Sequence, residues 1–266
     1  MGGPLSLSRP EITVVVPVFQ NSRTLPEIYK RLVITLDSYS LPYEVLFVDD
    51  ACPEGSIEVL KNLAEKDQKV GVIALERNVG QHRAAMTGLR YALGKWVAIL
   101  DADLQDPPEA IPLLLDRLRA GYAAVFAGRR GLYESPFRLL TSRLFKLALH
   151  LVAGVPRDAG IYMVMTRQMV DRLLAFPESR PFLLALMGCT GLPLSSIPVE
   201  RAKRPIGTSA YTFWQRVRVG FAALSWAICW KLFARRLEIG HIDKEIVVQA
   251  FIGDRFIPAH KEYSEA

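Results

Sequence analysis

Apolar runs alternate with amphipathic stretches from Ile12 to about residue 153. The first run, Ile12–Val18, is rich in β-branched residues and contains a proline near its end, as expected of a parallel strand buried on both faces. Strands of the same kind are predicted over 43–48, 70–75, 96–100 and 123–127. Between and after them the pattern predicts helices from about 24, over 55–67, over 81–93, from about 107 and over 136–153. Because strand and helix alternate, we expect an α/β fold with a parallel sheet.

The pattern becomes mixed in the second half of the chain, and we expect the main sheet to end near residue 153. Beyond it the pattern predicts a short strand, two helices, another strand and a long helix, over 161–166, 168–175, 180–188, 194–199 and 211–236. A last strand-like segment, 246–252, either completes the fold or pairs with a partner chain in a homo-oligomer.

Carboxylates follow two of the predicted strands. Asp49 and Asp50 end the second strand, and Asp101 and Asp103 flank Ala102 after the fourth. Parallel sheets bind ligands outside the carboxyl ends of their strands, so these side chains are expected to meet in one crevice. Two carboxylate oxygens there suit Mg2+ or Mn2+ and leave positions for the phosphates of a nucleotide. Alone, however, such a triplet is common and often caps a helix, and Asp106 is itself a plausible cap for the helix after it.

Missing motifs narrow the function. The turn after the first strand, residues 17–22 (PVFQNS), has no glycine, which disfavours both a dinucleotide-binding dehydrogenase and a nucleotidyltransferase. There is no P-loop either, so phosphate must be bound by metal and side chains. The net charge of +6 favours anionic partners, but no basic stretch interleaved with aromatic residues indicates nucleic-acid binding, and the scattered histidines and cysteines lack zinc-ligand spacing.

Four segments together resemble family 2 glycosyltransferases of the GT-A fold, and most closely the polyprenyl-phosphate sugar synthases of the dolichyl-phosphate mannose synthase-like branch. They are residues 15–21 (VVPVFQN), 48–55 (VDDACPEG), 77–80 (RNVG) and 101–109 (DADLQDPPE). The resemblance implies a Rossmann-like, mostly parallel central sheet flanked by helices, and the pattern over 211–236 adds a C-terminal amphipathic helical region. We therefore expect a flexible leader (1–10), a GT-A catalytic domain (11–210) and a C-terminal helix and tail (211–266).

The resemblance also implies roles for particular residues. Donor-nucleotide binding is carried over to Pro17, Phe19, Asn21, Asp49, Asp50, Asn78, Gln81, Asp101 and Ala102. The metal ligands would be Asp101, Asp103 and Gln105, and the catalytic residues Asp158 and Asp103. The acceptor phosphate would be held by Arg129, Arg138, Ser142, Arg201, Arg204, Ser209 and Tyr211. The chain departs from the family pattern at Tyr162-Met163 and at Ala210, both on the acceptor side.

We therefore expect an inverting glycosyltransferase that uses Mg2+ or Mn2+ and a UDP-, GDP- or TDP-sugar. Its expected acceptor is polyprenyl phosphate; the alternative is a soluble or saccharide hydroxyl. A non-catalytic membrane-surface adaptor is the rival class, because the segment Val217–Ala234 combines tryptophans and arginines as interfacial helices do. An amphipathic helix packed on the domain explains this segment equally well. No secretory signal precedes the first strand, so we expect a cytoplasmic protein, peripheral at the inner face of a membrane.

Overall fold

The computed structural model describes residues 9–130, 136–176, 182–202, 220, 224–225, 227–228, 247–252 and 255–257. For residues 129–130, 136–144, 247–252 and 255–257 the description covers the backbone alone. The predicted leader lies almost wholly outside this part of the chain. So does most of the predicted helix 211–236, of which residues 220, 224–225 and 227–228 are helical.

The helices and strands alternate as predicted through the first half of the chain. The strands are β1 (Ile12–Val18), β2 (Tyr43–Asp49), β3 (Val70–Leu75), β4 (Trp96–Ile99), β5 (Ala124–Arg130), β6 (Met163–Thr166), β7 (Leu194–Glu200), β8 (Val247–Ile252) and β9 (Arg255–Ile257). The α-helices are α1 (Leu25–Ser38), α2 (Ser56–Lys66), α3 (Gln81–Tyr91), α4 (Ile111–Arg119), α5 (Pro136–Ala153), α6 (Arg167–Leu174) and α7 (Leu183–Cys189). Short 3-10 turns, η1 (Ser22–Thr24) and η2 (Pro108–Ala110), lead into α1 and α4.

The described strands form one sheet in the order β7-β5-β6-β4-β1-β2-β3-β8-β9. β1 pairs in parallel with β2 and β4, β2 with β3, and β5 with β7, whereas β6 and β8 run antiparallel to their neighbours. A mostly parallel sheet flanked by helices is therefore confirmed.

The expectation that the sheet ends near residue 153 was wrong. The run Met163–Met165 is fully buried, and β6 inserts between β4 and β5 to satisfy the backbone of both. The strand-like segment near residue 246 also joins the sheet, because β8 pairs with β3 of the same chain. Of the two alternatives for that segment, the structure has the one in which it completes the fold.

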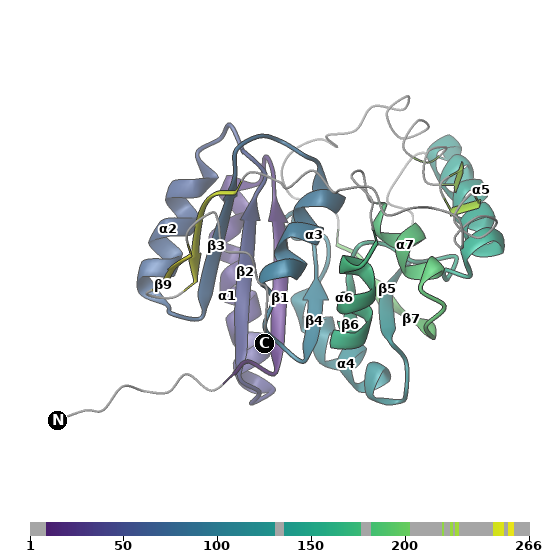
Figure 1. The fold of residues 1–266 in the computed structure, drawn as a ribbon, viewed down its shortest axis with the longest axis horizontal. Coiled ribbons are helices and arrows are strands. Elements are labelled where there is room, and N and C mark those ends of the chain that lie inside the picture. Colours follow the sequence, from purple (N-terminus) through teal and green to yellow (C-terminus); the bar gives the residue numbers. More distant parts are fainter. Residues whose placement is uncertain are drawn as a thin grey trace.

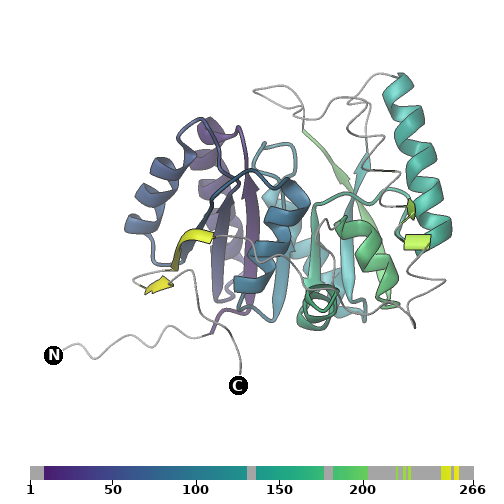
Figure 2. The ribbon, with the colours of Figure 1, turned by 45° about the horizontal axis from the view of Figure 1, so that its top comes forward.

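Helices cover both faces of the sheet, as Figure 1 shows with α3, α6 and α7 on its near side. Alternate residues of β1 belong to different cores: Val15 packs with α3, α6 and α7, and Val14 and Val16 pack with α1 and α4. This two-sided burial is why the strands read as continuous apolar runs. Figure 2 shows α2 and α5 at opposite ends of the sheet.

Helix α3 lies unusually close to the sheet. A Cβ on Gly88 would come within 3.0 Å of a methyl group of Val48 and closer still to Val15, so only glycine allows this approach. The close packing holds α3 against β1 and β2, and Gln81 at its start donates a hydrogen bond to Asp101 after β4. Across the described residues, no helix has the length and apolar character needed to cross a membrane.

Candidate active site

The loops that leave the central strands contain three strained residues. Gln20, Ala51 and Leu104 have φ of 57°, 51° and 60°, and follow β1, β2 and β4. Non-glycine residues in this left-handed region cost about 1 kcal/mol or more, and such strain concentrates at functional sites. The three loops meet at the edge of the sheet where the sequence predicted the ligand crevice.

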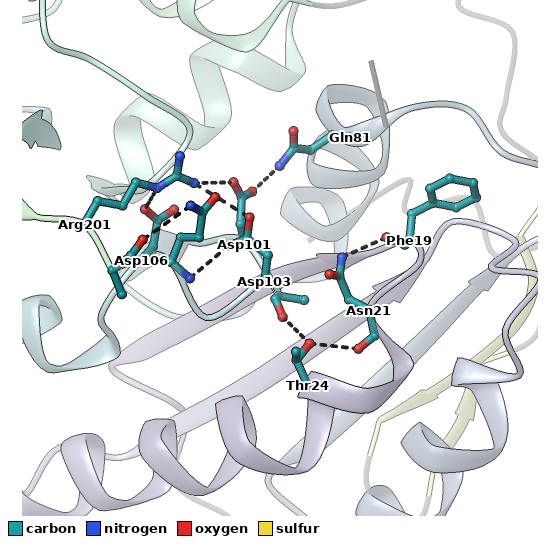
Figure 3. Close-up of polar contacts among 11 residues, drawn as sticks. Phe19, Asn21, Thr24, Gln81, Asp101, Asp103, Asp106 and Arg201 are labelled. Carbon is teal, nitrogen blue, oxygen red and sulfur yellow. Dashed lines mark hydrogen bonds and ion pairs between the residues drawn. The ribbon is translucent and has the colours of Figure 1, made fainter. Parts of the chain in front are cut away.

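The loop after β1 is joined to the acidic triplet. The Asn21 side chain donates to the Phe19 carbonyl at 2.8 Å, and the Thr24 hydroxyl donates to the carbonyl oxygens of Asn21 at 2.9 Å and Ala102 at 2.5 Å (Figure 3). Pro17 lies within β1, one residue before its end. Sequence reasoning did not single out Thr24, since a buried threonine at the start of a helix has no distinctive pattern.

Asp49 and Asp50 have different surroundings at the end of β2. Burial raises the pKa of Asp49, while hydrogen bonds from the Ser56 hydroxyl, at 2.5 Å, and the Cys52 backbone act in the opposite direction. Asp50 instead accepts backbone hydrogen bonds from Val79 at 2.7 Å and Gly80 at 2.9 Å.

The two carboxyl oxygens of Asp50 thus hold the turn into α3. Asn78 lies in this turn and donates to the Asp50 carbonyl at 3.3 Å. Asp50 and Asn78 were both predicted to bind the donor nucleotide. The contacts described here fix the shape of the β2–α3 edge of the crevice.

The loop after β4 gathers three carboxylates. Asp101 accepts a hydrogen bond from Gln81, and Asp103 accepts one from the backbone of Gln105 at 3.0 Å. Asp103 and Asp106 are each 3% exposed, so their charges need partners nearby. The interpretation of Asp106 as a helix cap was wrong: η2 has Pro107 at its N-cap and no side-chain cap hydrogen bond, and the Asp106 carboxylate turns toward Arg201.

Arg201 provides the positive charge. Its Nε lies 2.8 Å from Asp106, and its Nη2 lies 3.4 Å from Asp101 and 3.9 Å from Asp103 (Figure 3). Burial opposes the charged guanidinium, but the three carboxylates outweigh burial and raise the pKa of Arg201. The sequence assigned Arg201 to the acceptor side, and its contacts with the metal-ligand candidates carried no sequence signal because 95 residues or more separate the partners in the chain.

The residues of the triplet fit a divalent cation. Arg201 Nη2 lies within 4 Å of an oxygen of Asp101 and of Asp103, so both carboxylates already converge on one positive group. Carboxylate oxygens are the ligands that Mg2+ and Mn2+ prefer. No group of three or more His, Cys, Asp or Glu side chains in the described ranges is arranged to hold a metal by itself. Two protein carboxylates would therefore leave coordination positions for other oxygen ligands.

Asp158 lies against β5, across β6 from the triplet. A Cβ on Gly128 would fall 2.7 Å from the Asp158 Cγ and closer still to Oδ2, so the carboxylate occupies the space that a larger residue would fill. Gly128 pairs with Pro198, and two pairs further along the same ladder Arg130 pairs with Glu200, the residue before Arg201. Sequence reasoning did not find Gly128, because only the fold brings β5 to Asp158.

The remaining acceptor-side predictions have less structural context. The backbone of Arg129 belongs to β5, and that of Arg138 and Ser142 to α5, but their side chains lie outside the description. Arg204, Ser209 and Tyr211 fall outside the described residues altogether. The structure thus brings Asp101, Asp103 and Arg201 together beside the loops that carry the predicted donor residues, and it places Asp158 in the turn before β6.

Comparison with known proteins agrees with this geometry. The model of "Glycosyl transferase family 2" matches residues 13–172, which include all but the first residue of β1, the strands β2 to β6 and the acidic triplet. The chain belongs to this family. A relative from Pseudomonas fluorescens (strain SBW25), undecaprenyl-phosphate 4-deoxy-4-formamido-L-arabinose transferase, is 34% identical over 217 residues, covering 80% of this chain and 64% of the relative. This family 2 chain therefore spans less than two thirds of the relative's length.

Solved structures share the fold of this family 2 chain. A mannosyltransferase from Pyrobaculum calidifontis, in complex with GDP-Man and Mn2+, matches with a TM-score of 0.60 and 19% identity over 87% of this chain and 66% of that one. Glucosyl-3-phosphoglycerate synthase from Mycobacterium tuberculosis, in complex with Mn2+, UDP-Glc and phosphoglyceric acid, matches with a TM-score of 0.58 and 18% identity. The match covers 82% of this chain and 80% of the synthase chain. The predicted GT-A fold is confirmed.

Proposed function

We propose that this chain transfers a sugar from a nucleoside-diphosphate sugar to an acceptor by an inverting single displacement with Mg2+ or Mn2+. The observation that carries the proposal is the convergence of Asp101 and Asp103 on one positive group at the carboxyl ends of the central strands. Parallel α/β sheets bind ligands at this edge. The family match and the Mn2+-containing complexes of two proteins with this fold support the same assignment.

The donor would lie along the edge formed by the loops after β1, β2 and β4. We propose that Asp49, oriented by Ser56, binds the nucleoside, with Pro17 and Phe19 beside it. Asp101 and Asp103 would hold the metal, with Gln105 as the third ligand. When bound, a divalent ion neutralises the charge that develops on the departing diphosphate.

We propose a lipid phosphate as the acceptor. The Pseudomonas fluorescens relative is named an undecaprenyl-phosphate 4-deoxy-4-formamido-L-arabinose transferase, which supports this class. A phosphate monoester, with a second pKa of about 6, is largely ionised at neutral pH and needs no strong base. Asp158 would then orient the acceptor, whereas a hydroxyl acceptor would require Asp158 to accept its proton during attack. Such an enzyme would work at the inner face of a membrane, as a peripheral protein.

The metal assignment is tested by calorimetry of UDP-, GDP- and TDP-sugars with and without Mn2+. We expect one nucleotide class to bind only with Mn2+, and Asp101→Asn and Asp103→Asn each to weaken that binding by at least about tenfold, as expected when a charged ligand of a buried ion is removed. Asp116→Asn is the matched control, because this carboxylate lies on the surface and pairs with Arg119. Nucleotide binding that is the same with and without Mn2+ would refute the assignment.

The acceptor is tested with Asp158→Asn and the donor found above. Transfer to undecaprenyl phosphate should decrease moderately, with a shallow pH dependence, because the amide that replaces the carboxylate still forms hydrogen bonds and no base is needed. Transfer to a saccharide hydroxyl should be nearly abolished. An equally severe loss with both acceptors would contradict the proposed orienting role.

A further inference from the structure

We propose that Arg201 is an internal counter-cation, which occupies the place between Asp101 and Asp103 and must leave it when a divalent ion binds. The proposal rests on the proposed function, because it concerns the same two carboxylates. It adds an exchange between two cations: the protein's own guanidinium in the nucleotide-free state and the metal in the loaded state.

The charge balance of the loop supports this exchange. Asp101, Asp103 and Asp106 place three carboxylates around the guanidinium of Arg201, whose side chain is 8% exposed. Uncompensated carboxylates at such burial are costly, so a cation is needed whether or not metal is present. Bringing a divalent ion to the same oxygens while Arg201 remains would place like charges within a few ångströms of each other. Only one of the two cations can therefore bridge Asp101 and Asp103 at a time.

Asp106 provides Arg201 with an ion pair that does not depend on Asp101 or Asp103. The Nε–Asp106 contact of 2.8 Å is shorter than the contacts of Nη2 with Asp101 and Asp103, at 3.4 Å and 3.9 Å. The second Asp106 oxygen is buried and has no hydrogen-bond partner among the described residues. A rotation of the guanidinium about its Asp106 contact would release Asp101 and Asp103 and bring a second N–H to this oxygen. Arg201 can thus withdraw from the triplet without losing its closest charge partner.

The backbone next to Arg201 is attached to the same loop. Ala202 N donates to the Gln105 carbonyl at 2.9 Å, and the Gln105 side chain donates to the Ala202 carbonyl at 3.3 Å. These two contacts hold the end of β7 beside the loop after β4. They also mean that the predicted metal ligand Gln105 is engaged with the segment that carries Arg201, so release of one affects the other.

The test is the affinity for Mn2+ alone, measured by calorimetry without nucleotide. If the state with Arg201 in place outnumbers the open state by ten to one, it weakens apparent metal affinity by about tenfold. Arg201→Met should therefore bind Mn2+ at least about tenfold more tightly than wild type. Arg201→Lys keeps the charge but cannot contact Asp106 and Asp101 together, so its affinity should be intermediate. Arg31→Met, which removes the same charge from an ion pair with Glu109, should bind as wild type does.

Thermal unfolding gives a second readout that does not depend on activity. In EDTA, Arg201→Met should unfold at a lower temperature than wild type, because three carboxylates lose their counter-cation, and saturating Mn2+ should remove this difference. Equal or weaker Mn2+ affinity in Arg201→Met, with Mn2+-dependent nucleotide binding preserved, would overturn the exchange and leave the proposed function intact. If wild type itself showed no Mn2+-dependent nucleotide binding, both the exchange and the proposed function would be overturned.

Discussion

Gly128 is expected to set the position of Asp158, and Gly128→Ala tests this directly. The added methyl would lie 2.7 Å from the Asp158 Cγ and closer still to Oδ2, where ordinary contacts begin at 3.4 Å, so the carboxylate must move by more than about 0.7 Å. The methyl would also lie 3.2 Å from the carbonyl oxygen of Ile197, which belongs to the backbone of β7 and cannot move far. Movement of the Asp158 side chain is therefore the easier response.

The size of the effect follows from this displacement. A misplacement of about 1 Å in a reacting geometry can cost about 100-fold in rate, so we expect kcat to fall by about 10- to 100-fold. Crowding should cost no more than about 1–3 kcal/mol of stability. Because Gly128 has no described contact with Asp101 or Asp103, Mn2+-dependent nucleotide binding should stay unchanged.

A double-mutant cycle separates this mechanism from general damage. In an Asp158→Ala background the carboxyl group is absent, so adding Gly128→Ala should lower kcat no further. The assay is sugar transfer at saturating donor, with nucleotide affinity and unfolding temperature measured for all four proteins. The same fractional loss of kcat in both backgrounds would refute the reasoning, as would full activity of Gly128→Ala.

Three further predictions concern the described titrating groups. Burial lowers the pKa of His82 from 6.5 to about 4, so the protein should lose up to about 3 kcal/mol of stability as pH falls through this window, and urea unfolding of His82→Gln should lack that loss. Burial raises the pKa of Glu44 above 4.5, although a hydrogen bond from Thr13 acts in the opposite direction. The protonated Glu44 therefore stabilises the fold below pH 4.5, and this stabilisation is lost as pH rises above the raised pKa. The free energy of unfolding of Glu44→Gln should accordingly increase relative to wild type as pH rises to 7. Ser56→Ala removes the 2.5 Å contact that orients Asp49, and calorimetry should give about tenfold weaker nucleotide binding.

The local patterns predicted the central sheet because each strand there is buried on both faces. A strand such as Ile12–Val18, with every residue buried, can hardly be read as anything else, and the helix between each pair of strands enforces the parallel direction. β6 could not be placed in the same way. Its antiparallel position between β4 and β5 depends on pairing with both neighbours. The sequence of a four-residue strand does not indicate which other strands it pairs with.

The site divides along the same line. The position of Asp49, Asp101 and Asp103 at one edge of the sheet could be predicted, because the ends of parallel strands meet there wherever the strands occur in the chain. Arg201, Asp106 and Gly128 could not be assigned their contacts, since these join residues on different strands and loops by side-chain packing. The residues predicted for the acceptor side came from resemblance alone, and most of their side chains lie outside the described part of the chain.

The position of Arg201 connects the two sides. It follows β7, which pairs with β5, the strand that carries Gly128, and its side chain reaches over β6 to the carboxylates after β4. A cation that binds the triplet therefore acts on the strand pair beside Asp158 through one side chain, and Gln105 and Ala202 couple the backbones at the same point. If Arg201 yields its place to a metal, metal binding moves a charged side chain at the end of β7, the strand that pairs with β5.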